Sequence, residues 1–196
     1  VAHTFSICPL SRTGVGKSQT TRYVADYYKH KGYKVVAVRH PMPYDYNLNK
    51  QRCQRFETMQ DMDKYDCTIE EREEYYRHIE QHTLLFAGVD YPMILREAEK
   101  EADIILWDGG NNDLPFFKPD LHICLVDSLR PTDEEHYFPG ETNVRMADAV
   151  LVAKVDSGDA SSMRQAHMHA EHLKHITKAG VPVFFGQSTV TPDAKD

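Results

Sequence analysis

Ser11-Arg12-Thr13-Gly14-Val15-Gly16-Lys17-Ser18 is the stretch that decides the fold of this 196-residue chain. It follows a short apolar run at residues 4–8 and precedes a segment of helical periodicity at residues 19–30. A strand, a glycine-bearing turn and a helix N-terminus in this order form a phosphate cradle, because the N–H groups of the turn point at the bound anion. Ser11 stands where the G-x-x-x-x-G-K-[ST] pattern has its first glycine. We still favour a phosphate-binding loop over an ordinary surface turn, because the flanking strand and helix are in place.

The residues of this loop have distinct expected roles. Lys17 is predicted to reach the terminal phosphates, and the Ser18 hydroxyl is predicted to ligate Mg²⁺. The residues expected to contact the nucleotide are Arg12, Thr13, Gly14, Val15, Gly16, Lys17, Ser18 and Gln19. Arg12 stands where one large subclass of P-loop proteins carries an extra lysine, which often touches the phosphates of a facing subunit. A solvated loop arginine fits Arg12 equally well, so a homodimer or larger assembly is left open.

Asp108 is the second residue with predicted chemistry. It ends the apolar run at residues 102–107 and is followed by Gly109 and Gly110. A carboxylate at the end of a buried strand suits a Walker B position, where it holds Mg²⁺ directly or through water. The alternative is a purely structural aspartate that caps a turn. Together with the Lys17-Ser18 pair, the Walker B interpretation is favoured. Asn111, Asn112 and Asp113 continue this loop, where they either orient substrate or satisfy the turn.

A later loop is a candidate for contact with the base. The stretch Ala153-Lys154-Val155-Asp156 is similar to the guanine-reading N-K-x-D motif, with alanine in place of asparagine. Lys154 can still lie along a base, and Asp156 can still accept from an exocyclic amine. Without the asparagine amide, guanine specificity has no support, so we expect ATP and leave GTP open.

Cations at predicted strand ends are candidates for holding a small phosphorylated substrate. Ligands of open α/β sheets bind beyond the carboxyl ends of the strands. The cations expected there are Arg39, His40, Lys118, Arg130 and Arg145, of which Arg39, His40 and Arg145 are the main candidates. Any one of these residues could be an ordinary surface cation. A binding site is favoured because all of them are expected at one edge of the sheet.

Composition and charge set limits on the class of protein. The length favours one domain at residues 1–186 with a tail at 187–196, and residues 44–82 form a long excursion expected to be a lid or substrate loop. The net charge of −7 argues against a nucleic-acid surface, which needs a basic stripe.

Cys8 and Cys124 lie in apolar runs and resemble buried thiols of a reducing compartment. No apolar run is long enough to cross a bilayer and no signal peptide is evident, so a cytoplasmic protein is expected. The chain starts without methionine, which suggests a processed product or a piece of a longer protein.

Apolar runs alternate with helix-period segments along the whole chain. The expected strands are residues 4–8, 34–39, 102–108, 121–127, 149–153 and 181–185, and the expected helices are residues 19–30, 50–59, 72–82, 92–101 and 160–178. Thr68 and Glu71 form a capping box at the start of the third helix. The alternation predicts an α/β fold of the P-loop NTPase class, with a mostly parallel sheet flanked by helices on both faces.

The last helix carries four histidines, His167, His169, His172 and His175. Histidines at this spacing fit either a metal site or a polar helix face. No carboxylate partner for the histidines is evident from the sequence, so the polar face is preferred and no metal is assigned there.

Four strings resemble the cyclic 2,3-diphosphoglycerate synthetase family. They are RHPMPY at 39–44, CTIEEREEY at 67–75, ILWDGGNND at 105–113 and PGETNVRMAD at 139–148. The resemblance runs from the phosphate loop to about Asp156. It implies an ATP-dependent enzyme that closes an intramolecular phosphoanhydride in 2,3-bisphosphoglycerate and releases ADP and phosphate. Members carry further segments beside the P-loop domain, so we expect this chain to correspond to that domain alone. Ser11 and Ala153 replace the glycine and asparagine common in the family.

These observations predict an enzyme that uses Mg²⁺-bound nucleoside triphosphate for phosphoryl transfer, with Lys17 and Asp108 as the catalytic pair and Ser18 and Asp108 as metal ligands. Two alternatives stay open. One is a regulatory NTPase that switches the Gly109-Gly110 loop, and the other is a non-catalytic module of a larger assembly.

Overall fold

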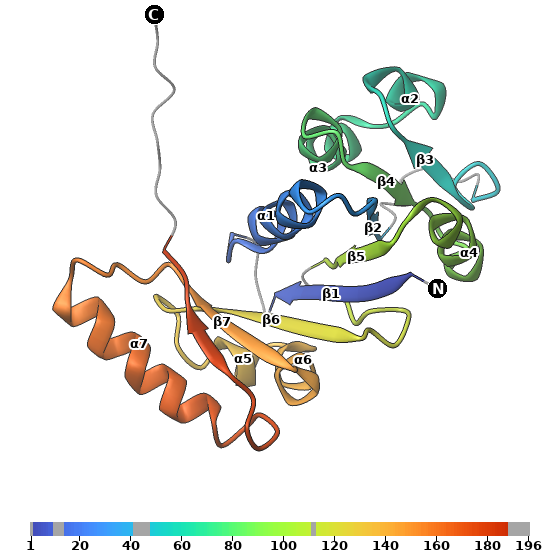
Figure 1. Cartoon of the computed structure of the whole chain (residues 1–196). Helices are drawn as coiled ribbons and strands as arrows, with labels where there is room; N and C mark the ends of the chain where they lie inside the picture. Colours follow the sequence, from blue (N-terminus) through green and yellow to red (C-terminus); the bar gives the residue numbers. More distant parts are fainter. Residues whose placement is uncertain (1, 10–13, 41–47, 111–112, 188–196) are drawn as a thin grey trace, which may run out of the picture.

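The computed structural model describes residues 2–9, 14–40, 48–110 and 113–187, and within them eight strands form one sheet (Figure 1). The strand order is β3-β4-β2-β5-β1-β6-β7-β8. The strands are β1 (His3–Pro9), β2 (Val35–Arg39), β3 (Gln54–Phe56), β4 (Leu84–Ala87), β5 (Ile104–Asp108), β6 (Leu121–Asp127), β7 (Ala149–Ala153) and β8 (Val183–Phe185). β3 pairs with β4 in the antiparallel sense, and every other pair is parallel.

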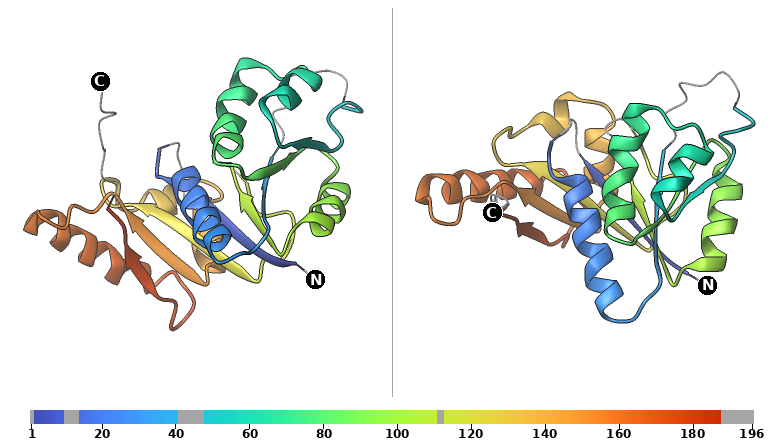
Figure 2. Two further views of the ribbon diagram at one scale, coloured as in Figure 1. Left: turned by 45° about the horizontal axis from the view of Figure 1, so that its top comes forward. Right: turned by 90° about the horizontal axis from the view of Figure 1, so that it is seen from above.

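Helices cover both faces of the sheet (Figures 1 and 2). They are α1 (Lys17–His30), α2 (Met59–Lys64), α3 (Ile69–Glu80), α4 (Tyr91–Glu101), α5 (Asp133–His136), α6 (Gly140–Met146) and α7 (Ala160–Leu173). The strand side chains alternate between the faces, as the period of two requires. Ala37 packs with the α2–α3 layer, and Leu106 packs with α1. Val36 and Ile105 face α4, and Val150 faces α6 and α7. The expected α/β architecture is therefore confirmed.

The register of the central strands brings the predicted site together. Asp108, the last residue of β5, pairs with Arg39 of β2 on one side and with Ile7 of β1 on the other. β1 leads through the phosphate loop into α1, so the carboxyl ends of three neighbouring strands converge on the start of that helix. Ligand sites of parallel sheets lie at this edge.

Most expected elements are present, with differences around residue 55. The helix expected at residues 50–59 is wrong: Gln54–Phe56 form the edge strand β3, and α2 begins only at Met59. β3 alternates buried, half-buried and buried side chains against β4, a contact that overrides local helical spacing. β4, α5 and α6 were not expected from the sequence at all. The last helix ends at Leu173 rather than at residue 178.

The segment expected to be an excursion builds one end of the sheet. Phe56, Met62 and Tyr75 form a buried cluster over Ala37 and Leu85. The structure therefore gives residues 54–80 a packed core of their own, and a role for them as a lid stays a prediction. The predicted tail lies outside the described residues from 188 onward. Within the described ranges, no helix combines the length and apolar character that a membrane crossing needs.

Candidate nucleotide-binding site

The first turn of α1 has the geometry of an anion cradle. Gly14 and Gly16 adopt φ angles of 82° and 104°. Residues with a Cβ are strained in this region, and glycine is not. Gly16 is the N-cap of α1 and supplies no side-chain cap, so the amides of the first turn stay available within the described part of the chain. A Cβ at Gly14 would meet no described atom within 4 Å. Val15 anchors the turn by packing on Leu125 of β6. Arg12 and Thr13 lie outside the described residues, and Gln19 is exposed.

The carboxylate of Asp108 faces this cradle through one of its oxygens. Lys17 Nζ lies 3.3 Å from Oδ1, and the Ser18 hydroxyl lies 3.5 Å from the same atom. The buried Thr21 hydroxyl donates to Oδ1 at 3.2 Å. The structure thus brings together the lysine, the hydroxyl and the carboxylate that the sequence predicted.

The second oxygen of Asp108 is held from the other side. Arg39 Nη1 donates to Oδ2 at 2.7 Å, and His78 Nε2 lies 3.0 Å from it. Because a carboxylate only accepts, the imidazole donates from Nε2. The other guanidinium arm of Arg39, Nη2, pairs with Glu74 Oε2 at 2.5 Å. Asp108 is fully buried, and the side chains of His78 and Arg39 are almost as buried, so these contacts are shielded from water.

Positive charge dominates the surroundings of this single buried carboxylate. Burial alone would raise the pKa of Asp108, but Arg39, Lys17 and the His78 hydrogen bond hold that pKa well below its usual range. Burial, and then the cations Arg77 and Arg39, lower the pKa of the half-buried Arg22, against the opposing pull of Asp108. A chain with a net charge of −7 therefore concentrates cations at this point, as a phosphate site requires.

Sequence reasoning missed Glu74, His78 and Thr21. Glu74 and His78 are one turn apart on α3, and a capping box fixes the start of that helix: Glu71 N donates to Thr68 Oγ1, and Thr68 N donates to Glu71 Oε2. The sequence carries no local pattern that joins Glu74 and His78 to Asp108, because their contacts depend on how α3 packs against the sheet. Of the other buried residues of this helix, Glu71 belongs to its capping box and Tyr75 packs against Phe56.

His40 lies beside the glycines that follow β5. Its Nδ1 is 3.1 Å from Asp113 Oδ2, which also accepts from the Gly110 amide at 2.9 Å. A Cβ at Gly110 would come within 2.7 Å of both side chains, so a larger residue there would displace His40 and Asp113. Burial lowers the pKa of His40, and Arg39 and Lys17 add to this against the pull of Asp113, so the imidazole is neutral at physiological pH. Asn111 and Asn112 lie outside the described residues.

The expected base-contacting residues lie further along the same sheet edge. Lys154 Nζ donates to Asp127 Oδ2 at 2.7 Å, and Arg130 pairs with the same carboxylate. Asp156 Oδ1 accepts from the Gly158 amide and so closes a local turn. None of the described contacts joins these side chains to Lys17 or Asp108, so their role toward a base stays a prediction.

The contacts of two other expected cations are with residues outside the cradle. Arg145 pairs with Glu141 one turn earlier on α6. Lys118 precedes β6, and its carbonyl accepts from the Thr4 hydroxyl near the start of β1, at the amino edge of the sheet. The expectation that Lys118 lies at the carboxyl edge is wrong, because residues 114–120 lead into β6 at the start of that strand.

The histidines of α7 find carboxylate partners that the sequence did not reveal. His169 Nε2 is 2.6 Å from Glu134 Oε1, and both side chains are buried. His172 pairs with Glu135 at the surface. The polar-face prediction therefore fails for His169, because α5 comes to lie against α7 although about 35 residues separate them. No group of three potential metal ligands occurs among the described residues.

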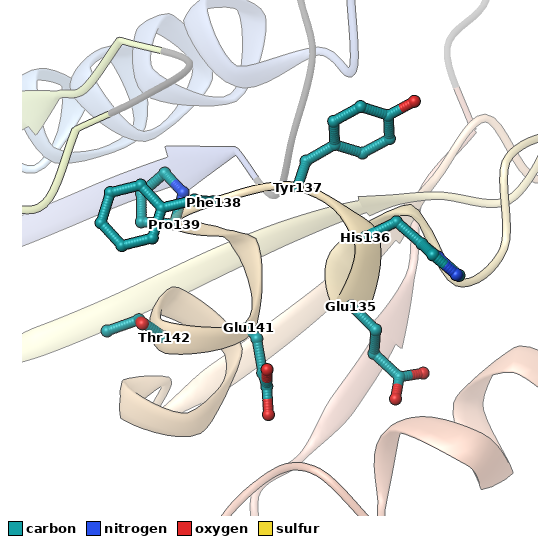
Figure 3. Close-up of a pocket in the computed structure, with 7 residues that line it drawn as sticks. All are labelled: Glu135, His136, Tyr137, Phe138, Pro139, Glu141 and Thr142. Carbon is teal, nitrogen blue, oxygen red and sulfur yellow. The ribbon is translucent and has the colours of Figure 1, made fainter.

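A hollow of about 180 Å³ lies between α5 and α6 (Figure 3). It is lined by Glu135, His136, Tyr137, Phe138, Pro139, Glu141 and Thr142. Glu135 and Glu141 point to the same side of it, and Tyr137 points to the opposite side. Glu135 and Glu141 place two carboxylates at this hollow, which disfavours a triphosphate there.

The donor set at the cradle fits a magnesium-bound triphosphate. Mg²⁺ prefers hard oxygen ligands, and the Asp108 carboxylate and Ser18 hydroxyl are the oxygen pair that face each other here. Lys17 and the free amides of α1 complement phosphate oxygens. The fold and this edge of the sheet define the class: the chain has the P-loop NTPase fold.

Comparisons with solved structures support that class. LpxK from Aquifex aeolicus, solved in complex with ATP, matches 94% of this chain and 53% of its own at a TM-score of 0.60 and 18% identity. The hydrogenase maturation factor HypB from Archaeoglobus fulgidus matches 94% of this chain and 81% of its own at a TM-score of 0.56 and 14% identity. FlhF, solved with GMPPNP and Mg²⁺, gives a TM-score of 0.55 at 9% identity and covers 98% of this chain and 68% of its own. At these identities the likeness is one of fold.

A closer sequence relationship exists with a longer protein. The chain is 54% identical over 176 residues to arginine synthetase ArcE of Thermococcus kodakarensis. The matched region is 88% of this chain and 39% of that protein, so the chain spans about two fifths of its relative. No model of a known protein family matches the chain.

Proposed function

We propose that this chain is the nucleotide-binding part of a synthetase that transfers the terminal phosphoryl group of a Mg²⁺-bound nucleoside triphosphate, with ATP preferred and GTP open. The observation that carries the proposal is the buried Asp108, whose Oδ1 faces both Lys17 and Ser18 at the uncapped start of α1. The 54% identity to a protein named as a synthetase supports the same class of reaction.

Different residues of the chain bind the phosphates, the metal, the acceptor and the base. Lys17 and the amides of residues 14–16, continued by Arg12 and Thr13, neutralise charge on the phosphates, and Ser18 and Asp108 hold the metal. The metal supplies further charge neutralisation on the phosphate oxygens when bound. Arg39 and His40 lie next to Asp108 at the end of β2, on the side where an acceptor would approach. Lys154 and Asp156 are the candidates for contact with the base.

The contacts of the three main candidate cations indicate which charge the acceptor has. Arg39 is paired with Asp108 and Glu74, and Arg145 is paired with Glu141. His40 is neutral, because its pKa is lowered by burial and neighbouring cations. None of these three candidate cations therefore offers an unpaired positive charge to an acceptor. A neutral acceptor group suits this edge better than a bisphosphate does.

The name of the relative supplies such an acceptor. The relative is named an arginine synthetase. By general chemistry, a nucleoside triphosphate can drive formation of a guanidinium group from a ureido group and ammonia, and citrulline is the ureido compound that would give arginine. In that chemistry the ureido oxygen attacks the terminal phosphorus and ADP leaves. Ammonia then adds to the carbon, loses a proton, and the C–O bond breaks to release phosphate. Cyclisation of 2,3-bisphosphoglycerate is the second candidate, which the four sequence strings quoted above favour.

Two measurements test the proposal. Calorimetry with ATP and Mg²⁺ should show binding to the wild-type chain and at least tenfold weaker binding to Lys17→Ala, because the lysine ammonium is the main point charge on the phosphates. Absence of binding by ATP and by GTP would overturn the proposal. Phosphorus NMR of ATP turnover with citrulline and ammonium, compared with 2,3-bisphosphoglycerate, then decides between the acceptors.

A further inference from the structure

The two oxygens of Asp108 are held differently, and this difference is the starting point. Oδ1 faces Lys17 and Ser18 at the cradle. Oδ2 is turned away, where it is bound by Arg39 and His78 at 2.7 Å and 3.0 Å. Thr21 also donates to Oδ1, at 3.2 Å. The contacts on Oδ2 set the orientation of the carboxylate, and with it the direction in which Oδ1 faces the cradle.

The groups that hold Oδ2 are themselves positioned by α3. His78 is a residue of that helix, and its side chain is 1% exposed. Arg39 belongs to β2, but its second arm is held at 2.5 Å by Glu74, one turn before His78 on the same helix. Two contacts from one helix therefore converge on one carboxylate oxygen, directly through His78 and indirectly through Arg39.

We propose that Glu74 and His78 are positioning residues of the nucleotide site. Together with Arg39 they anchor Oδ2, so that Oδ1 is presented to the metal-bound triphosphate at the start of α1. This inference rests on the proposed function of the same site. Outer partners that orient a metal-ligating carboxylate typically change metal affinity or activity by about 10–100-fold when they are removed.

The role predicts a defect in one measured quantity, the gain in nucleotide affinity that Mg²⁺ provides. The probe is the non-hydrolysable ATP analogue AMP-PNP, titrated by calorimetry with excess Mg²⁺ and again with EDTA. Glu74→Gln and His78→Ala should each reduce the ratio of the two affinities by about tenfold or more, with the affinity in EDTA unchanged. His78→Gln should recover much of the ratio, because an amide N–H can still donate to Oδ2.

Glu70→Gln is the matched control. Glu70 lies on α3 one turn before Glu74, but its side chain is exposed, and the variant should keep the wild-type ratio. His78 is fully buried and its alanine variant can fail to fold, which circular dichroism would show. Glu74→Gln then decides, because that side chain is 40% exposed and the change keeps its shape.

Each outcome has a separate meaning. A wild-type chain that binds no AMP-PNP overturns the proposed function. A wild-type chain with a clear effect of Mg²⁺, and a Glu74→Gln variant that matches Glu70→Gln, overturns the positioning role and leaves the proposed function intact. Equal losses with Mg²⁺ and with EDTA would also contradict the role, because they would indicate general damage to the cradle.

Discussion

At the scale of single residues, Asp108 is a fully buried charge whose pKa is held well below its usual range. It is fully buried among the cations Lys17 and Arg39 and the hydrogen-bond donors Ser18, Thr21 and His78. A buried charge in such a position is stable only while its partners are present. Its removal therefore affects the stability of the fold as well as the chemistry of the site.

Asp108→Asn is expected to destabilise the nucleotide-free protein by about 3 kcal/mol, because loss of one member of a buried ion pair leaves the other charge uncompensated. Arg39 keeps Glu74 as a partner, which places the value at the lower end of the range. Urea unfolding followed by circular dichroism measures the effect. Asp63→Asn, whose side chain is 72% exposed in its pair with Arg72, should change stability by less than about 1 kcal/mol. A loss at Asp108 no larger than at Asp63 would contradict this account.

The depressed pKa of Asp108 also predicts a dependence on pH. A carboxyl group whose pKa is lower in the folded state stabilises the protein above its unfolded pKa of about 3.9. That contribution is lost as the pH falls below about 4 and through the folded pKa. The difference in unfolding free energy between wild type and Asp108→Asn should therefore shrink on acidification. A difference that stays constant down to about pH 3 would show that the carboxyl group is not depressed.

At the scale of elements, α3 links the middle of the chain to the nucleotide site. The capping box that begins it was read from Thr68 and Glu71 in the sequence and is confirmed by both of its hydrogen bonds. Because this motif is local, it depends only on residues three apart and is visible without the fold. What α3 touches is not local, and Glu74 and His78 were missed for that reason.

Thr68→Ala should lower the stability of the protein by about 1 kcal/mol, because the amide of Glu71 then loses its acceptor at the helix start. Thermal or urea unfolding measures this loss. Thr68→Ser keeps the hydroxyl oxygen and should stay close to wild type. An equal loss in both variants would assign the effect to the methyl group of Thr68 instead of to the cap.

At the scale of the whole molecule, six of the eight described strands and four of the seven described helices could be predicted, but not the lateral order of the strands. The apolar runs of β6 and β7 were predicted with their observed bounds, since a buried parallel strand is continuous in sequence. Which strands become neighbours depends on contacts between distant segments, for which no local pattern exists. For the same reason, the sequence could not reveal that His78 contacts Asp108 or that α5 packs against α7. The edge strand β3 was missed because its three residues carry too short a signal.

The contact between α5 and α7 allows a matched test at this scale. Glu134→Ala is expected to cost about 3 kcal/mol, because it leaves the buried His169 imidazole without its partner. Glu135→Ala removes the same atoms from the neighbouring residue, but its pair with His172 is about 40% exposed and should contribute less than about 1 kcal/mol. Urea unfolding of the two variants gives the comparison, and equal losses would refute the importance of burial here.

The pairing of Arg39 and Asp108 across neighbouring strands has a consequence for how such proteins diverge. Their spacing is set by the hydrogen-bonded ladder between β2 and β5, not by the connections that follow these strands. Insertions or deletions in those connections can therefore accumulate over generations without disturbing the guanidinium and the carboxylate. New acceptors can be recruited by such changes while the machinery for the triphosphate is inherited intact.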